Sequence, residues 1–353
     1  MHMADALLAP AVAGAMYVCS AGAAGVSVRG LKDEETTEKL PMMAVGAALV
    51  FAGQMINYTI PGTGSSGHLC GGMMLSALLG PKAGFLSMIV VLAIQCLFFA
   101  DGGLLALGAN IWNMAFYGCF VGYYLIWRPI MRSRLFSGMG EKAAVRARIV
   151  LASILGCVIS LQLGAFSVVL ETQLSGITEL PFGAFTALML PIHLAIGLVE
   201  GLITSAVLLF VYEARPQLLM DVSPAKDGSC RFSLGVTVAI LAVITALVGG
   251  GLSLLASSHP DGLEWALFGN ADAGYAENMA LDKEDYGVVS PAAEAAASVQ
   301  EKTAFLPDYA FADSDSPAGT TVAGLVGSLI VAAFAGLICA AGALIRRRRK
   351  VHA

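Results

Sequence analysis

The stretch AFTALMLPIHLAIGLVEGLITSAVLLFVY, residues 184–212, decides the fold class of this chain. It is apolar along almost its whole length, holds one carboxylate (Glu200) and one histidine (His193), and has no lysine or arginine. An α-helix needs about 20 predominantly apolar residues to cross the hydrocarbon core of a bilayer. The sequence therefore predicts that residues 184–212 form a transmembrane helix.

Similar apolar runs recur along the whole chain. Of its 353 residues 57% are hydrophobic and only 13% are charged, with a mean hydropathy of +0.77, whereas about 25% of residues are charged in a soluble domain. We therefore expect an all-α integral membrane protein with nine spans. The third run is short, which is typical of a half-helix or of a helix that begins inside the protein. The nine runs are 7–28, 41–57, 68–80, 83–99, 104–127, 146–170, 184–212, 233–256 and 318–345.

The lysines and arginines predict how these spans are oriented. If the loops are numbered alternately from an outer N-terminus, all but two of the 20 basic residues fall in inner loops or in the tail after residue 345. The exceptions, Lys283 and Lys302, lie in the long loop 257–317. Since cytoplasmic loops carry an excess of lysine and arginine, we expect a multi-pass protein of the cell (inner) membrane, with the N-terminus outside and the C-terminus in the cytoplasm. The basic tail 346–350 is most simply an anchor against anionic lipid of the bilayer, and no nucleic-acid partner is expected.

The chain is expected to divide near residue 222. Residues 1–221 are predicted to form a seven-helix substrate-binding core, and residues 222–353 a two-helix hairpin joined by the outer loop 257–317. That loop holds 12 carboxylates against two lysines, and its middle is rich in alanine. Its simplest interpretation is a solvated tether, with a weak metal-attracting surface and a docked lid as the alternatives.

Several kinds of chemistry have no support in the sequence. The seven cysteines form no C-x-x-C pair, and six of them lie in apolar runs, so we expect neither a disulfide framework nor a thiolate metal site. No G-x-x-x-x-G-K-[ST] motif occurs, so the chain is not expected to hydrolyse ATP by itself. A membrane enzyme is also disfavoured, because no nucleophile–base–acid constellation is recognisable.

The first two residues offer a set of metal-binding nitrogens. No positive region precedes the first apolar run, so the N-terminus is not a conventional signal peptide and is expected to stay on the mature protein. The α-amine of Met1, the backbone amide nitrogen of His2 and the His2 Nδ1 atom can then close a five-membered and a six-membered chelate ring. Three nitrogens leave one position of a square plane, a geometry that suits nickel(II) or copper(II). A histidine at position 2 is uninformative by itself, so this hypothesis needs a fourth ligand.

His68 is the candidate for that fourth ligand. The segment 57–72 lies between the second and third apolar runs, on the same predicted side as the N-terminus, and is rich in glycine and serine. Glycines allow close approach of the backbone to a buried chain end, and the imidazole of His68 would complete four nitrogens. No lysine follows this loop, which argues against the alternative of a phosphate-binding loop.

Polar residues within and between the apolar runs flank this candidate site. Four of them are predicted to fix the imidazoles and the chain end, although ordinary interhelical hydrogen bonds are an equal alternative: Gln95, Asp101, Asn110 and Asn113. His193 is more readily a structural histidine, whereas Glu200 is a functional candidate because ionisable groups inside a membrane are costly.

Several motifs, in order along residues 1 to about 215, resemble those of one family. They are the start 1–6 (MHMADA), the loop 60–68 (IPGTGSSGH) and the segment 97–108 (LFFADGGLLALG) with Asn110 and Asn113. They are similar to the substrate-binding membrane component, of the CbiM/NikM type, of cobalt/nickel energy-coupling-factor transporters. The segments 259–265 (HPDGLEW) and 305–309 (FLPDY) resemble the small PDGLE-type accessory component of these systems, here fused to the core.

The resemblance implies that Met1, His2 and His68 bind nickel(II) or cobalt(II) as the transported substrate, with no catalytic cofactor. It also implies partners on other chains, namely a membrane coupling (T) subunit and two ATPase subunits. Many nickel-type members begin Met-His-Ile-Pro-Asp-Gly, whereas Met3 and Ala4 follow His2 here, so the choice between nickel and cobalt stays open. The alternative function is a proton-coupled secondary metal transporter, with Glu200 or Asp101 as the proton relay.

Overall fold

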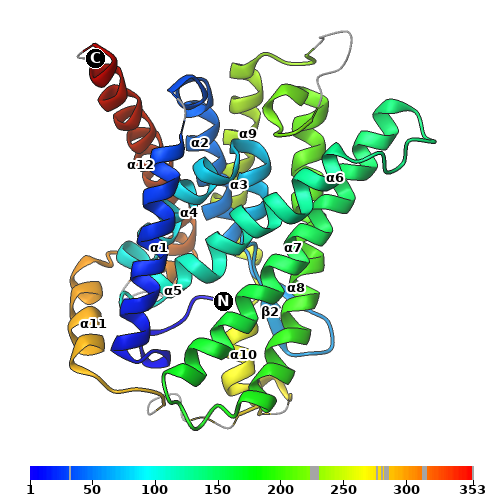
Figure 1. The fold of residues 1–353 in the computed structure, drawn as a ribbon. Coiled ribbons are helices and arrows are strands. Elements are labelled where there is room, and N and C mark those ends of the chain that lie inside the picture. The colour runs from blue at the N-terminus through cyan, green and yellow to red at the C-terminus, as the bar shows by residue number, and fades with distance from the viewer. Residues whose placement is uncertain are drawn as a thin grey trace.

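The computed structural model describes residues 1–31, 33–222, 230–275, 277–279, 281, 286–311 and 316–351. Lys283 lies outside the described residues, and so do the side chains of the basic tail 346–350. Most of the chain is helical, and the long helices run roughly side by side (Figure 1). The elements in chain order are η1 (Asp5–Leu7), α1 (Pro10–Gly30), α2 (Asp33–Gln54), β1 (Tyr58–Ile60), β2 (Ser65–Gly67), α3 (Gly72–Leu79), α4 (Pro81–Phe99), α5 (Leu107–Asn110), η2 (Ile111–Trp127), α6 (Arg128–Arg132), α7 (Glu141–Leu174), α8 (Phe182–Ala214), η3 (Pro216–Leu218), α9 (Leu234–Gly250), η4 (Leu252–Leu255), α10 (Gly262–Phe268), η5 (Ala271–Ala273), α11 (Pro291–Thr303), η6 (Pro307–Tyr309) and α12 (Ala318–Val351).

Six helices in the described chain are long and apolar enough to cross a membrane: Pro10–Gly30, Pro81–Phe99, Glu141–Leu174, Phe182–Ala214, Leu234–Leu255 and Ala318–Ile338. They confirm the expected all-α membrane protein, in which the only described sheet is the two-stranded pair β1–β2. The apolar part of α2, Leu40–Gln54, is shorter. The number of spans therefore stays a prediction.

Helix α3 accounts for the short third apolar run. It has eight residues and is about 12 Å long at 1.5 Å per residue, less than half of a hydrocarbon core of about 30 Å. Gly71 and Gly80 flank it with φ values of 86° and 85°, a left-handed backbone that favours glycine and ends the helix on both sides. Every residue of α3 is buried, so this half-helix lies inside the protein.

The basic loops that the structure describes gather at one end of the molecule. The Lys82 Nζ atom donates a hydrogen bond to the Gly30 carbonyl oxygen at 3.4 Å, so the α3–α4 turn lies beside the end of α1. Arg132, at the end of α6, pairs with Asp221, which follows α8. The C-terminal end of α12 lies at the same end, in the upper part of Figure 1.

The last two long helices form the predicted hairpin. Helices α9 and α12 pack against each other and against α2. Their backbones meet at Gly249 and Gly324, where a Cβ atom added to Gly324 would lie 1.9 Å from the Gly249 carbonyl oxygen. Only glycine permits this approach, and the close contact holds α9 and α12 together.

The loop between α9 and α12 covers the N-terminal segment at the opposite end of the molecule (Figure 1). Backbone hydrogen bonds tie it to the core: Ser66 donates to the Pro260 carbonyl oxygen at 2.8 Å, and Val288 donates to that of Ala6 at 2.7 Å. Helix α10 packs on α8 and β2, and α11 packs on α4 and η1. The prediction of a solvated tether is wrong for the described residues, because these short helices pack against the core. The loop is docked, and its role as a lid or as a metal-attracting surface stays a prediction.

Candidate metal centre

The first eight residues enter the interior of the core. Met1 is 5% exposed and Met3 is fully buried. The Asn110 side chain holds Met3 on both sides, since its Oδ1 accepts from the Met3 N–H at 2.8 Å and its Nδ2 donates to the Met3 carbonyl oxygen at 3.2 Å. The predicted role of Asn110 in fixing the chain end agrees with this geometry.

Two glycines after α4 make room for the buried N-terminal segment. The Gly103 N–H donates to the Met3 carbonyl oxygen at 2.9 Å. A Cβ atom on Gly103 would lie 1.8 Å from Asp5 Oδ1, and one on Gly102 would lie 2.8 Å from the Asn110 amide nitrogen. No other residue type allows the two backbones to come this close.

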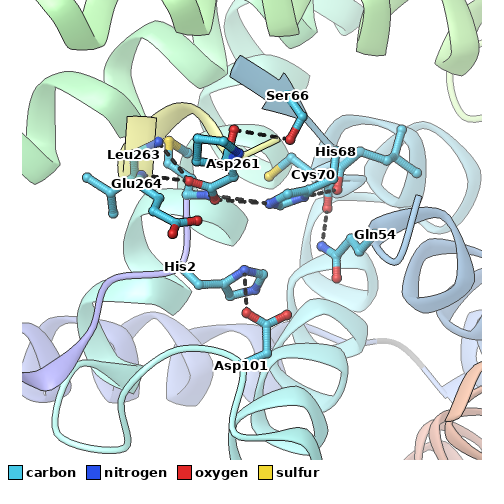
Figure 2. Close-up of polar contacts among 12 residues, drawn as sticks. His2, Gln54, Ser66, His68, Cys70, Asp101, Asp261, Leu263 and Glu264 are labelled. Carbon is cyan, nitrogen blue, oxygen red and sulfur yellow. Dashed lines mark hydrogen bonds and ion pairs between the residues drawn. The ribbon is translucent and has the colours of Figure 1, made fainter. Parts of the chain in front are cut away.

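The α-amine of Met1 meets one histidine and one carboxylate. Its nitrogen lies 3.3 Å from His68 Nε2 and 2.5 Å from Asp261 Oδ2. The same Oδ2 atom is 3.7 Å from His68 Nε2. Groups from the first residue of the chain, from the loop before α3 and from the N-terminus of α10 thus converge; Figure 2 shows His68 and Asp261 facing each other.

The His68 ring is oriented so that its Nε2 atom faces the Met1 amine and could act as a metal ligand. Its Nδ1 atom lies 3.0 Å from the Leu69 carbonyl oxygen. Because a carbonyl oxygen only accepts hydrogen bonds, Nδ1 is the donor in this contact, and Nε2 is the ring nitrogen that points toward the amine. The side chain is 10% exposed, so this orientation is set by the protein interior.

Glu200 holds the backbone that presents His68. Its Oε2 atom accepts from the Cys70 N–H at 3.0 Å, and its Oε1 atom accepts from the Gly71 N–H at 2.9 Å. Both carboxylate oxygens are therefore engaged by the turn that leads into α3. This geometry gives Glu200 a structural role beside the candidate site.

The His2 ring stacks on His68 and turns toward Asp101. The two ring centroids are 5.4 Å apart, with an angle of 21° between the planes. The His2 Nδ1 atom lies 3.1 Å from Asp101 Oδ1, whereas its buried Nε2 atom has no hydrogen-bond partner in the described part of the chain. Burial lowers the pKa of His2 to about 4, with the Met1 ammonium and His68 also lowering it and Asp101 opposing them. The ring is thus a neutral imidazole, but the Nδ1 atom expected in the chelate faces Asp101 here.

A hydrogen-bonded chain leads from His2 to the outer loop. Asp101 Oδ2 accepts a hydrogen bond from the Tyr309 hydroxyl at 2.5 Å. The same hydroxyl accepts from Gln95 Nε2 at 3.1 Å. Asp101, predicted to support the ligands, therefore contacts His2 directly, and Gln95, predicted for the same role, connects to it through Tyr309 and Asp101. Tyr309 belongs to the 305–309 motif, but the sequence assigned it no role at this site.

Asn113 makes a more distant contact with the N-terminal segment. Its Nδ2 atom donates to Glu171 Oε2 at 2.8 Å and lies 3.6 Å from the Met3 sulfur. Of the four residues predicted to flank the site, Asn113 is thus the one that bonds mainly to a neighbouring helix, which was the alternative interpretation.

Asp261 is the site residue that sequence reasoning missed. Its Oδ1 atom caps α10 by accepting from the N–H groups of Leu263 and Glu264, at 2.8 and 2.9 Å, and Oδ2 faces the amine. Burial alone would raise the pKa of Asp261, but the Met1 ammonium and His68 outweigh it and hold that pKa well below its usual range. The PDGLE motif at 260–264 was visible in the sequence, yet nothing local linked it to residue 1.

His193 lies closer to the site than its structural interpretation implied. With Met1, His68 and Asp261 it lines an inner cavity of about 10 Å³. Its Nδ1 atom contacts the Met189 carbonyl oxygen at 2.8 Å, and its Nε2 atom has no partner among the described residues. Within the same described residues, no group of three or more His, Cys, Asp or Glu side chains is arranged to hold a metal ion.

Family models match the two parts of the chain separately. The model described as the cobalt uptake substrate-specific transmembrane region (CbiM) matches residues 2–218, and the PDGLE domain model matches residues 236–347. A solved structure described as a truncated transition metal transporter has 30% sequence identity and a TM-score of 0.48, and the match covers 60% of this chain and 99% of that one.

Curated relatives span nearly the full chain. A putative fused nickel transport protein of Archaeoglobus fulgidus is 37% identical over 94% of this chain and 96% of its own length. A fused nickel transport protein of Rhodobacter capsulatus is 28% identical over 98% of this chain and 99% of its own length. The buried N-terminal segment and the docked PDGLE loop thus occur in a chain that belongs to the CbiM family, with a PDGLE domain fused to its C-terminal side.

Proposed function

We propose that this chain is the metal-capturing subunit of an ATP-driven energy-coupling-factor importer for nickel(II) or cobalt(II). One observation carries the proposal: the buried α-amine of Met1 lies 3.3 Å from His68 Nε2. Two nitrogens bound at right angles to one ion, each at about 2.1 Å, are about 3.0 Å apart. The amine and the imidazole are therefore close to the spacing that two neighbouring ligands of one metal ion require.

His2 supplies the remaining donors of the proposed site. Its backbone amide nitrogen follows the amine directly, and its Nδ1 atom reaches the ion once the ring turns away from Asp101. Four nitrogens in a plane suit nickel(II), and cobalt(II) can take the same arrangement. The ammonium and the amide must lose protons on binding, so metal capture releases protons to solvent.

The assignment of the two ends to the two sides of the membrane follows from charge. The described basic loops share the end of the molecule opposite the outer loop, and lysine and arginine are enriched on the cytoplasmic side. We assign the N-terminus and the outer loop to the outside of the cell (inner) membrane.

Residues 1–221 act as the metal-binding core and residues 222–353 as the accessory part of the proposed importer. A membrane coupling subunit and two ATPase subunits, on other chains, drive release inward.

The proton-coupled alternative is less well supported by the contacts. Glu200 accepts two backbone N–H groups, and Asp101 is engaged by His2 and Tyr309. A proton relay needs a carboxylate that exchanges protons during the cycle, whereas these two are held by fixed donors. Both are better explained as groups that position the ligands.

The test compares nickel and cobalt binding to the purified full chain with its native N-terminus and to a variant with one extra residue before Met1. The extension moves the amine away from His68, and we expect binding to weaken by about 10- to 100-fold, the scale on which metal sites respond to lost positioning. Equal binding by a folded, extended protein would remove Met1 from the site. The same titration ranks the two metals.

A further inference from the structure

An outer cavity of about 500 Å³ lies directly before the candidate site. Its lining includes four carboxylates and His2, and no lysine or arginine: the carboxylates are Asp5, Asp101, Asp261 and Glu264. The His2 side chain is only 7% exposed, and its Nε2 atom has no partner among the described residues. Imidazole nitrogen and carboxylate oxygen both attract divalent transition-metal ions, and here they are spread around the cavity lining rather than gathered at one coordination point in the described residues.

The two cavities differ in what they can hold. A water molecule occupies about 30 Å³ of liquid, so the outer cavity has room for an ion with several of its waters. The inner cavity, of about 10 Å³, has room for about one water at most. An ion passing from the outer to the inner cavity must therefore lose most of its hydration shell.

Asp261 is a residue that lines both cavities and carries a charge. Met1, His68 and His193 line the inner one but not the outer. The Oδ1 atom of Asp261 is fixed by the N-terminus of α10, so the carboxylate cannot swing freely. Its Oδ2 atom accepts from the Met1 ammonium at 2.5 Å, and an arriving cation would compete with this ammonium for the same oxygen.

We propose that the outer cavity is a loading site for a hydrated divalent transition-metal ion, and that Asp261 of the fused PDGLE part transfers the ion from it to the Met1 amine. This inference rests on the proposed function. The carboxylates attract the ion, and Asp261 replaces part of its hydration shell. The amine and His68 then take the ion, and Asp261 is left outside the plane of four nitrogens.

The experiment measures the rate of nickel(II) capture by the full-length protein in detergent, by stopped-flow absorbance of the nickel complex at low and high salt. Asp261→Asn keeps the size and the helix-capping oxygen of the side chain. Glu264→Gln removes a cavity carboxylate that is not one of the proposed ligands. Glu301→Gln is the matched control, because Glu301 is exposed on the same loop and lines neither cavity.

At low salt we expect Asp261→Asn to slow capture by about tenfold and Glu264→Gln by a smaller factor, since steering by local charge is worth about 10-fold or more in association rate. Glu301→Gln should capture at the wild-type rate, and the differences should shrink at about 1 M salt, where charges are screened within about 3 Å. The number of nickel ions finally bound should stay the same in all variants. Wild-type rates for both Asp261→Asn and Glu264→Gln would overturn the inference.

Two further outcomes separate this inference from the proposed function. If Asp261→Asn lowers the amount of nickel bound at equilibrium without slowing capture, Asp261 is a ligand or a structural group and the loading role is wrong. If the wild-type chain and the N-terminally extended chain bind nickel equally, the proposed site fails whatever the rates of the Asp261 variants are. A thermal melt of each variant identifies any loss of fold, and Glu264→Gln still tests the cavity in that case.

Discussion

At the scale of single residues, two carboxylates that are not among the four proposed nitrogen ligands hold the groups of the candidate site in place. Asp101 contacts His2, and Asp261 contacts the Met1 amine. Each is held by a second group, Asp101 by the Tyr309 hydroxyl and Asp261 by backbone N–H groups of α10. Such partners orient a ligand and set its protonation state.

Tyr309→Phe tests whether the hydrogen bond from Tyr309 helps Asp101 to hold His2. The change removes the hydroxyl that donates to Asp101 and leaves the ring in its contact with Phe99, whose centroid is 4.9 Å away. We expect nickel affinity to fall by about 10-fold, because Asp101 then holds His2 less firmly. Isothermal titration calorimetry measures the change.

The matched control for that variant is Tyr275→Phe. Tyr275 is 38% exposed on the same outer loop and makes no contact with Asp101 in the described structure. The affinity of the Tyr275→Phe variant for nickel should equal that of the wild type. An unchanged affinity in Tyr309→Phe would mean that Asp101 positions His2 without help from the outer loop.

At the scale of elements, the short helix α3 lets an irregular loop reach the middle of the protein. The strands β1 and β2 pair between residues 58 and 67, and the chain then turns at Gly71 into a helix of eight residues. A full-length helix would satisfy its own backbone groups. Here Glu200 of α8 satisfies the N–H groups of Cys70 and Gly71 instead, which is how non-helical backbone is tolerated inside a membrane protein.

Glu200→Gln is expected to disturb this turn. Glutamine keeps one carbonyl oxygen but places an NH₂ group against a backbone donor, so one buried N–H loses its partner at a cost of about 1–3 kcal/mol. A thermal melt should show lower stability, and nickel affinity should fall because His68 lies two residues before Cys70.

Glu213→Gln is the control for the Glu200 variant. Glu213 pairs with Arg146 at the other end of the molecule, and its side chain is 43% exposed, so its loss should change stability by no more than about 0.5 kcal/mol. If Glu200→Gln instead retains stability and metal affinity but abolishes pH-dependent uptake, the proton relay is the better explanation for Glu200.

At the scale of the whole molecule, the two ends of the protein differ in charge and in what covers them. The described basic loops gather at one end, and the acidic outer loop covers the N-terminal segment at the other (Figure 1). The fused PDGLE part reaches the candidate site at two places, through Asp261 and through Tyr309. A chain that carries both parts keeps these contacts at a fixed stoichiometry.

Cysteine labelling tests the orientation that follows from this division. In intact cells, a membrane-impermeant maleimide should label Ala295→Cys, on α11 of the outer loop, because lysine- and arginine-rich loops face the cytoplasm. Ser137→Cys, in the basic loop before α7, should react only after permeabilisation. Both positions are exposed, and the unsubstituted protein gives the background. The reverse pattern would place the N-terminus in the cytoplasm and exclude capture of metal from outside.

The sequence by itself determined the membrane class and the positions of the long apolar helices, and it identified Met1, His2 and His68 as candidate ligands. These are local properties: the length of an apolar run decides whether a helix can cross a bilayer, and a chelate of neighbouring residues depends only on their identity and order. The amides and the carboxylate near the site were also recognisable, because polar groups within apolar runs must find partners. The sequence does not tell which residues those partners are.

Only the tertiary structure decided how the site is completed. Asp261 and the Met1 amine are 260 positions apart in the sequence, and Tyr309 and Asp101 are 208 apart, so no periodicity or local motif connects them. The outer loop was expected to be a solvated tether because its composition is acidic and rich in alanine. Its short helices fold against the core only once the N-terminal segment, α4 and α8 provide a surface, and helix formation in such short segments depends on that packing.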